Sequence, residues 1–154
     1  MAYVVLVNIL AVVCHETVFL APPFCLLTLK LSFMTFPYPL QQPSPVFHHS
    51  IHLAHPRDIG LMKLGAITGR NTKKDFIDLY LILEREQLSL RQLIKLLVKQ
   101  FSPATYDSYH LYKALSYFAE ADKESMPKMI LKISWNHIKR FFEQEVARAI
   151  NAKE

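Results

Sequence analysis

The sequence predicts an α+β protein, in which a mainly helical bundle of about five helices packs on a short, incomplete N-terminal sheet. Two observations support this fold class. Apolar residues recur at helical spacing after residue 55, whereas Val- and Ile-rich runs precede it. Nearly all the charge also lies in the second part, because Glu16 and Lys30 are the only charged residues before Arg57. We therefore expect residues 1–54 to be a sheet remnant with a Pro-rich connection, and residues 55–154 to be a helical domain.

The N-terminal segment is expected to form buried strands. Residues 1–13 are apolar except for Asn8, and residues 28–34 alternate as strands do. The first run is shorter than the ~20 apolar residues of a membrane span. It also lacks the basic start of a signal peptide. Residues 36–45 form the Pro-rich connection, and residues 46–53 are expected to form one more short strand.

Composition sets broad limits on function. The chain has 154 residues, is 51% hydrophobic and carries a net charge of +5 with a pI near 9.2. This basicity permits contact with nucleotides or nucleic acid, but it is equally typical of solvated helix faces. Cys14 and Cys25 show no ligand or disulfide spacing, so we expect reduced thiols, a cytoplasmic location and no membrane attachment. No metal site is assigned to the histidines of residues 48–55, because adjacent strand residues face opposite sides and no carboxylate lies nearby.

Helix boundaries in residues 55–154 follow from capping residues and apolar periodicity. Pro56 suits the first turn of a helix that ends before Gly69, and Ser89 and Ser134 each suit an N-cap position. A helix of residues 106–120 should turn Leu111, Leu115 and Phe118 inward. The five expected helices begin near Pro56, Thr72, Ser89, Tyr106 and Ser134.

The candidate functional residues lie where the first two helices meet. Lys63 is the only charged residue from Ile59 to Gly69, and a lysine is rarely buried without a partner. Asp75 and Asp78 share a face of the next helix by their spacing of three, so we expect Lys63 to pair with one of them. Arg70, Lys73 and Lys74 make the intervening turn cationic, which favours a phosphate ligand.

Several motifs, in order, are similar to the C-terminal part of the AbiEii/AbiGii-type nucleotidyltransferase toxins. They are Lys30-Leu-Ser-Phe33, Phe36-Pro-Tyr-Pro-Leu40, Pro56-x-Asp58-Ile-x3-Lys63 and Arg70-x3-Lys74-Asp75-x2-Asp78-Leu-Tyr80. The resemblance covers residues 29–149. It implies a nucleotidyltransferase-like fold and a role in an abortive-infection or toxin-antitoxin system. Full-length relatives transfer a nucleoside monophosphate from a nucleoside triphosphate, with Mg²⁺, to an RNA or other acceptor.

The same resemblance assigns roles to individual residues. It implies that Lys63, Asp75 and Asp78 are catalytic, and that Arg70, Lys74 and Asp58 bind the nucleotide. The family's metal-binding motif, a Gly-Ser followed by paired carboxylates, has no counterpart, because no Asp precedes Asp58 and no Gly precedes Gly60. We therefore interpret the chain as a truncated member and expect no metal-dependent transfer by it alone.

A non-enzymatic alternative fits the same residues. In this hypothesis Lys63 forms a structural ion pair, and the chain is a helical interaction module whose basic helices bind an antitoxin partner. Tyrosines among the basic residues of the fourth expected helix could stack on bases, but such tyrosines more often pack half-buried.

Overall fold

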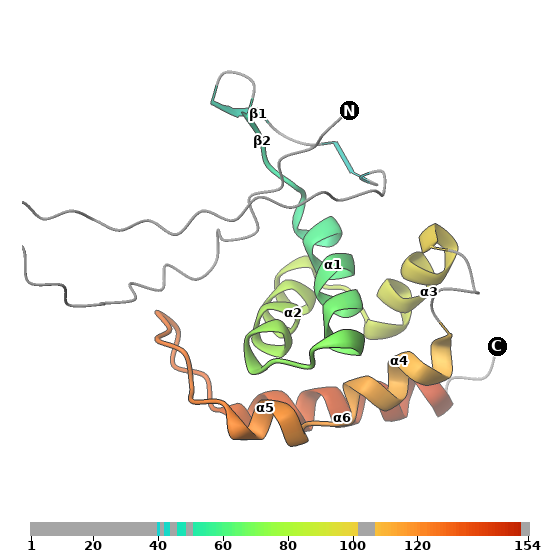
Figure 1. Cartoon of the computed structure of the whole chain (residues 1–154). Coiled ribbons are helices and arrows are strands. Elements are labelled where there is room, and N and C mark those ends of the chain that lie inside the picture. Colours follow the sequence, from blue (N-terminus) through green and yellow to red (C-terminus); the bar gives the residue numbers. More distant parts are fainter. Residues whose placement is uncertain (1–39, 41, 44–45, 49–50, 102–106, 152–154) are drawn as a thin grey trace, which may run out of the picture.

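The computed structural model describes residues 40, 42–43, 46–48, 51–101 and 107–151. Its helices lie side by side and cross one another, with α1 and α2 above the layer that contains α4, α5 and α6 (Figure 1). The elements are β1 (Val46–His48), β2 (Ile51–His52), α1 (Pro56–Gly69), α2 (Lys73–Glu86), α3 (Leu90–Phe101), α4 (Ser108–Leu115), α5 (Ala119–Lys123) and α6 (Trp135–Asn151).

The predicted N-terminal ends of three helices are confirmed. Pro56 occupies the first turn of α1. Ser89 begins α3 with a capping box, because its hydroxyl accepts from the Gln92 amide at 3.3 Å while its own amide donates to the Gln92 side chain at 3.0 Å. Ser134 precedes α6 and accepts from the His137 amide at 3.2 Å. Local capping therefore positions these helices.

Phe76 of α2 lies at the centre of the buried core. Its ring contacts those of Phe118, Trp135 and Phe142 with centroid separations of 5.2, 5.9 and 5.3 Å. These contacts join α2 to α6 and to the residue that precedes α5. Edge-on packing of large rings buries much apolar surface and adds a favourable quadrupole term.

A glycine lets α1 approach its neighbours closely. A Cβ atom added at Gly60 would lie 3.2 Å from Ile82 of α2 and within 3.6 Å of Leu93 of α3. The α1–α2 contact is the most extensive helix pair of the described chain. Close approach matters here because Lys63 of α1 reaches Asp75 and Asp78 of α2 across this interface.

The predicted fold class is wrong. The described residues fold as helices packed on one another, and their β-structure is limited to the short antiparallel pair β1 and β2 ahead of α1. No nucleotidyltransferase-like sheet supports the helices in the part of the chain that the structure describes. The amphipathic helices bury their apolar faces against each other around Phe76, so within these residues they need no sheet to cover them. The strands expected in residues 1–13 and 28–34 lie outside the described residues.

Two predicted elements are divided in the structure. The single strand expected over residues 46–53 is instead the pair β1 and β2. The single helix expected over residues 106–120 stops at Leu115 and resumes at Ala119. The Ser116 hydroxyl bonds back to the Tyr112 carbonyl at 3.0 Å, and this non-helical turn directs Phe118 toward Phe76. The inward positions of Leu111, Leu115 and Phe118 are confirmed.

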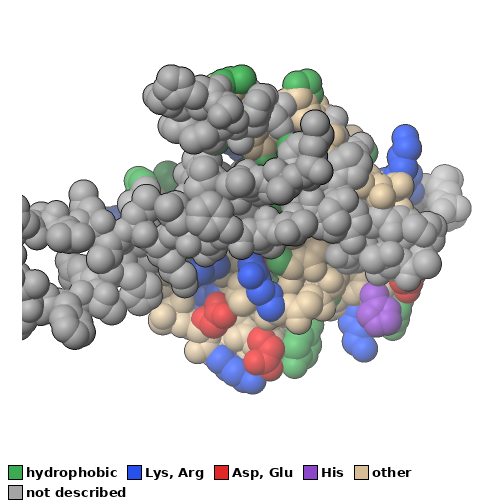
Figure 2. Space-filling model, turned by 45° about the horizontal axis from the view of Figure 1, so that its top comes forward, with side chains coloured by type: hydrophobic (Ala, Val, Ile, Leu, Met, Phe, Trp, Pro, Cys, Tyr) green, Lys and Arg blue, Asp and Glu red, His purple; other side chains and the backbone are tan. Residues whose placement is uncertain are grey.

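The described surface carries charges of both signs. In Figure 2 basic and acidic side chains lie next to one another on the part of this face that is coloured. None of the described helices combines the length and apolar character needed to cross a membrane.

Candidate functional site: an ion network between the first two helices

Lys63 of α1 binds two aspartates of α2. Its ammonium lies 3.2 Å from Asp75 Oδ1 and 2.6 Å from Asp78 Oδ2. The exposed fraction of the Lys63 side chain is 10%, against 1% for Asp75 and 22% for Asp78. The predicted pairing is therefore confirmed with both aspartates. Their spacing of three residues places both carboxylates on the α2 face that meets α1.

Arg70 completes the network from the end of α1. Its Nε donates to Asp75 Oδ2 at 2.6 Å, and its Nη2 donates to Asp75 Oδ1 at 2.8 Å. This is the two-pronged geometry that a planar guanidinium forms with a carboxylate. The Arg70 side chain is nevertheless 62% exposed, because Asp75 binds only one edge of the guanidinium group. Most of the Arg70 side chain is therefore accessible to solvent.

The environment keeps Asp75 ionised. Burial acts to raise the pKa of its carboxyl group, but hydrogen bonds from Arg70 and Thr72 and the positive charge of Lys63 outweigh that effect. The pKa of Asp75 is therefore below its ordinary value. The hydrogen bond to Asp75 raises the pKa of Arg70 against the opposing effect of its partial burial. Both groups are charged across the physiological range of pH.

The turn between α1 and α2 is tied to distant parts of the chain. Asn71 has a φ of 50°, in the left-handed region that Asn tolerates better than most residues. Its side-chain amide donates to the carbonyls of Ile67 at 3.4 Å and Ala114 at 3.0 Å. The second of these bonds holds the turn against the end of α4, so the position of Arg70 depends on tertiary contacts as well as on α1.

A second anchor lies at the first residue of α2. The Lys73 amide donates to the Glu124 carboxylate at 2.8 Å, and the Lys73 ammonium donates to the Glu124 carbonyl. The same ammonium stands 5.3 Å from the centroid of the Trp135 ring, within the range of a cation–π contact. Lys73 is therefore buried and committed to structural contacts rather than available to a ligand.

The structure places the other two predicted nucleotide-binding residues differently. Asp58 is buried in the first turn of α1, where its carboxylate accepts from the Gln42 amide at 3.2 Å. Lys74 is exposed on α2 and forms no ion pair with any described residue. Of the six predicted site residues, Lys63, Arg70, Asp75 and Asp78 thus form one continuous network, and Lys74 stands beside it at the surface.

The part played by Thr72 was not predicted from the sequence. Its hydroxyl donates to Asp75 Oδ2 at 2.7 Å and so gives the buried carboxylate another partner. The spacing Thr72-x-x-Asp75 has the form of a capping box, a signal that could have indicated this contact. No such local signal marks Asn71 or Glu124, since their partners lie 43 and 51 residues away in the chain.

The network does not fit a pair of divalent cations. Both oxygens of Asp75 already accept hydrogen bonds from cationic or hydroxyl donors. No group of three or more His, Cys, Asp or Glu side chains among the described residues is arranged to hold a metal ion. Two Mg²⁺ ions would need several oxygen ligands each, and this part of the chain does not offer them. The site is an ion network in which two cations are paired with two carboxylates, and the Arg70 side chain is 62% exposed.

Fold and site together define a helical domain that encloses a buried ion network. No family model matches the chain, and no solved structure matches it. The chain is 32% identical over 124 residues to a protein of Aquifex aeolicus (strain VF5) whose name is "Uncharacterized protein aq_aa25". The matched region covers 80% of this chain and 58% of that protein, so the chain spans well under two thirds of the relative's length. The name of the relative states no activity.

Proposed function

We propose that the chain is the helical part of a nucleotidyltransferase-like toxin of the AbiEii/AbiGii type, and that its α1–α2 turn binds the phosphates of a nucleoside triphosphate. The proposal rests on the way in which Arg70 is both held by Asp75 and exposed to solvent. Asp75 fixes one edge of its guanidinium, while a side chain that is 62% exposed leaves the other donors available. An arginine oriented in this way is suited to bind phosphate oxygens, and Lys74 adds a nearby exposed charge.

The network supports this role in a second way. Two motifs that carry the family resemblance, one containing Lys63 and the other containing Arg70, Asp75 and Asp78, meet in a single set of contacts. In this proposal Lys63 is a positioning residue, since it holds the Asp75 carboxylate that in turn orients Arg70. The described residues do not fit the metal ions that nucleotidyl transfer requires, so the proposal is limited to nucleotide binding.

Nucleotide binding is the direct test. The full chain would be titrated into a fluorescent nucleoside triphosphate analogue, and the Arg70→Ala variant should bind about tenfold more weakly because it loses a charge-assisted contact. Arg70→Lys should recover part of that loss. Lys128→Ala is the matched control, because Lys128 is an exposed lysine on the loop between α5 and α6. Binding that is unaffected by Arg70→Ala and by Lys74→Ala would contradict the proposal.

Transfer is tested separately with labelled nucleoside triphosphates, Mg²⁺ and either bulk tRNA or total protein. We expect no transfer above background by the isolated chain. Transfer that is lost in Lys63→Ala but kept in Lys128→Ala would show that this expectation of inactivity is wrong. Circular dichroism of each variant would distinguish loss of the site from loss of the fold.

The second candidate function is a non-catalytic interaction module that binds an antitoxin or another protein partner. The balance of charge in the network favours it. Lys63 and Arg70 are offset by Asp75 and Asp78, which is the arrangement of a structural ion cluster. Absence of both nucleotide binding and transfer would favour this candidate.

A further inference from the structure

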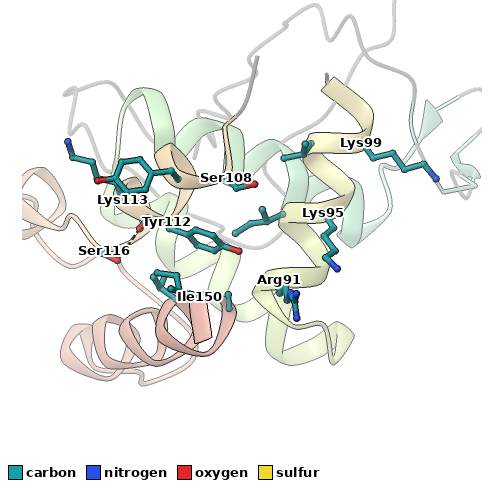
Figure 3. Close-up of a pocket in the computed structure, with 13 residues that line it drawn as sticks. Arg91, Lys95, Lys99, Ser108, Tyr112, Lys113, Ser116 and Ile150 are labelled. Atoms are coloured by element: carbon teal, nitrogen blue, oxygen red, sulfur yellow. Dashed lines mark hydrogen bonds between the residues drawn. The ribbon is translucent and has the colours of Figure 1, made fainter. Parts of the chain in front are cut away.

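A groove lies between α3, α4 and the C-terminal half of α6. Its volume is about 1030 Å³, just above the roughly 300–1,000 Å³ typical of small-molecule pockets. Tyr112 of α4 points across the gap toward α3, and Ile150 closes it from α6 (Figure 3). The groove is therefore bounded by three helices and is large enough for a peptide segment.

The floor of the groove is aliphatic. Ile94 and Val98 of α3 and Val146 and Ala149 of α6 line it, with Ile150 61% exposed at the edge. Ile94, Val146 and Ala149 are buried, so they support the floor from below. Val98 is half-buried and Ile150 is exposed, so these two side chains present the apolar surface of this concave site. Apolar anchors of a partner would find this floor already formed.

The rim of the groove is basic. Four cations line it, from α3 and α4, and no carboxylate does so: Arg91, Lys95, Lys99 and Lys113. None of the four forms an ion pair with another described residue. In Figure 3 the ends of Lys95 and Lys99 project from the side of α3 away from Tyr112, so their charges lie on the outer edge of the groove. An occupant should therefore be apolar on one side and acidic at its flanks.

We propose that this groove binds an amphipathic helix of a partner protein, with aliphatic anchors on one face and Asp or Glu beside them. Anchors at i, i+3, i+4 and i+7 would lie on the floor, and the flanking carboxylates would meet the basic rim. The aliphatic floor favours such a helix over RNA, because bases stack on aromatic rings and Tyr109 and Tyr112 are the only aromatic residues of the lining. Residues 1–39 match the rim poorly, since Glu16 is their only carboxylate.

This proposal deepens the second candidate function and rests on it, because it names the surface and the chemistry of the partner. It does not depend on nucleotide binding, which is proposed for the α1–α2 turn. Failure of the nucleotide assay would leave the groove proposal intact. Failure of the peptide assay described next would reject this surface without excluding a partner elsewhere.

The probe is a designed helical peptide of about 18 residues, with Leu anchors on one face and Glu at the flanks. A matched peptide carries Lys in place of each Glu. Fluorescence anisotropy with the full chain should give a dissociation constant on the order of 10 μM for the acidic peptide. The lysine peptide should bind at least about tenfold more weakly, because its flanks repel the rim. Equal binding of the two peptides would overturn the proposal.

Variants locate the binding to the groove. Lys95→Glu with Lys99→Glu should weaken binding of the acidic peptide by about tenfold or more. Ile150→Glu should have a similar effect through the floor, and all three residues are exposed, so the fold should persist. Lys128→Glu with Lys132→Glu, on the exposed loop before α6, is the matched control and should leave binding unchanged. An equal loss in that control would contradict the assignment to this surface.

Two further measurements separate other occupants. An oligouridine of about twelve nucleotides that displaces the acidic peptide at lower concentration would assign the groove to RNA. A dimer in sedimentation equilibrium that Ile150→Glu dissociates would assign it to a second copy of the chain. Either result would overturn the proposal, whereas a monomer that binds only the acidic peptide would support it.

Discussion

The network between α1 and α2 and the groove between α3, α4 and α6 both contain basic side chains, but their charges are balanced differently. In the network, Lys63 pairs with Asp75 and Asp78, and Arg70 pairs with Asp75, all within 3.2 Å. In the groove, four cations border an aliphatic floor and have no acidic partner among the described residues. The network satisfies its charges within the fold, whereas the groove leaves its charges to the solvent. Basic residues that look alike in the sequence thus contribute to stability in one region and favour recognition in the other.

The largest effect should come from removing the shared carboxylate of the network. We expect Asp75→Ala to lower the free energy of unfolding by about 3 kcal/mol, because it leaves Lys63 largely buried and removes the partner of Arg70. The value lies at the low end for a broken buried pair, since Lys63 keeps Asp78 and Arg70 can reach water. Urea denaturation would measure it. The exposed Glu143→Ala should change little, and an equally small change in Asp75→Ala would show that the network does not stabilise the fold.

Removing the lysine should cost less than removing the aspartate. We expect Lys63→Met to lower the free energy of unfolding by about 1–2 kcal/mol, because Asp75 keeps its bonds to Arg70 and Thr72. Methionine also retains much of the apolar stem of lysine. The same denaturation series would compare the two variants. A loss in Lys63→Met larger than that in Asp75→Ala would reverse the proposed order of importance within the network.

Acid should weaken the network in a defined direction. The pKa of Asp75 is lower in the folded chain than its unfolded value of about 3.9, so the folded state binds its proton less readily. Its contribution is therefore complete above the unfolded pKa and is lost as the pH falls through the folded pKa. We expect unfolding free energies measured from pH 6 to pH 3 to fall less steeply in Asp75→Asn. An unchanged slope would exclude Asp75 as a source of the pH dependence.

The smallest effect on stability should come from the groove. Lys95→Glu and Lys99→Glu alter exposed side chains that make no described ion pair, so each should change the free energy of unfolding by less than about 0.5 kcal/mol. The comparison would be sharpened by finding near-native stability together with lost peptide binding. A large loss of stability on either substitution would instead indicate that these lysines have partners within the fold.

How far the site could be predicted depends on the distance between partners in the chain. The pairing of Lys63 with Asp75 and Asp78 followed from one isolated lysine and two aspartates on the same face of the next helix. The two-pronged contact from Arg70 was not predicted, because the spacing of residues does not fix the orientation of a guanidinium. The family resemblance assigned Lys74 to the nucleotide, and in the structure this lysine is exposed and lies outside the ion network.

Helices whose start signals are local could be predicted from the amino-acid sequence. Pro56, Ser89 and Ser134 mark the starts of α1, α3 and α6, since a capping residue acts within one turn of the chain. The inward positions of Leu111 and Leu115 likewise followed from periodicity, because the side chains of one helix face recur every three or four residues.

Which surfaces those helices share is set by the tertiary structure. It interrupted the helix expected over residues 106–120 so that Phe118 could reach Phe76, and it fixed the α1–α2 turn through Asn71 and the distant carbonyl of Ala114. It also replaced the expected sheet-supported bundle with helices packed on one another in the described residues. Such contacts join residues far apart in the chain, so they contribute to the free energy of folding only once the helices have packed together.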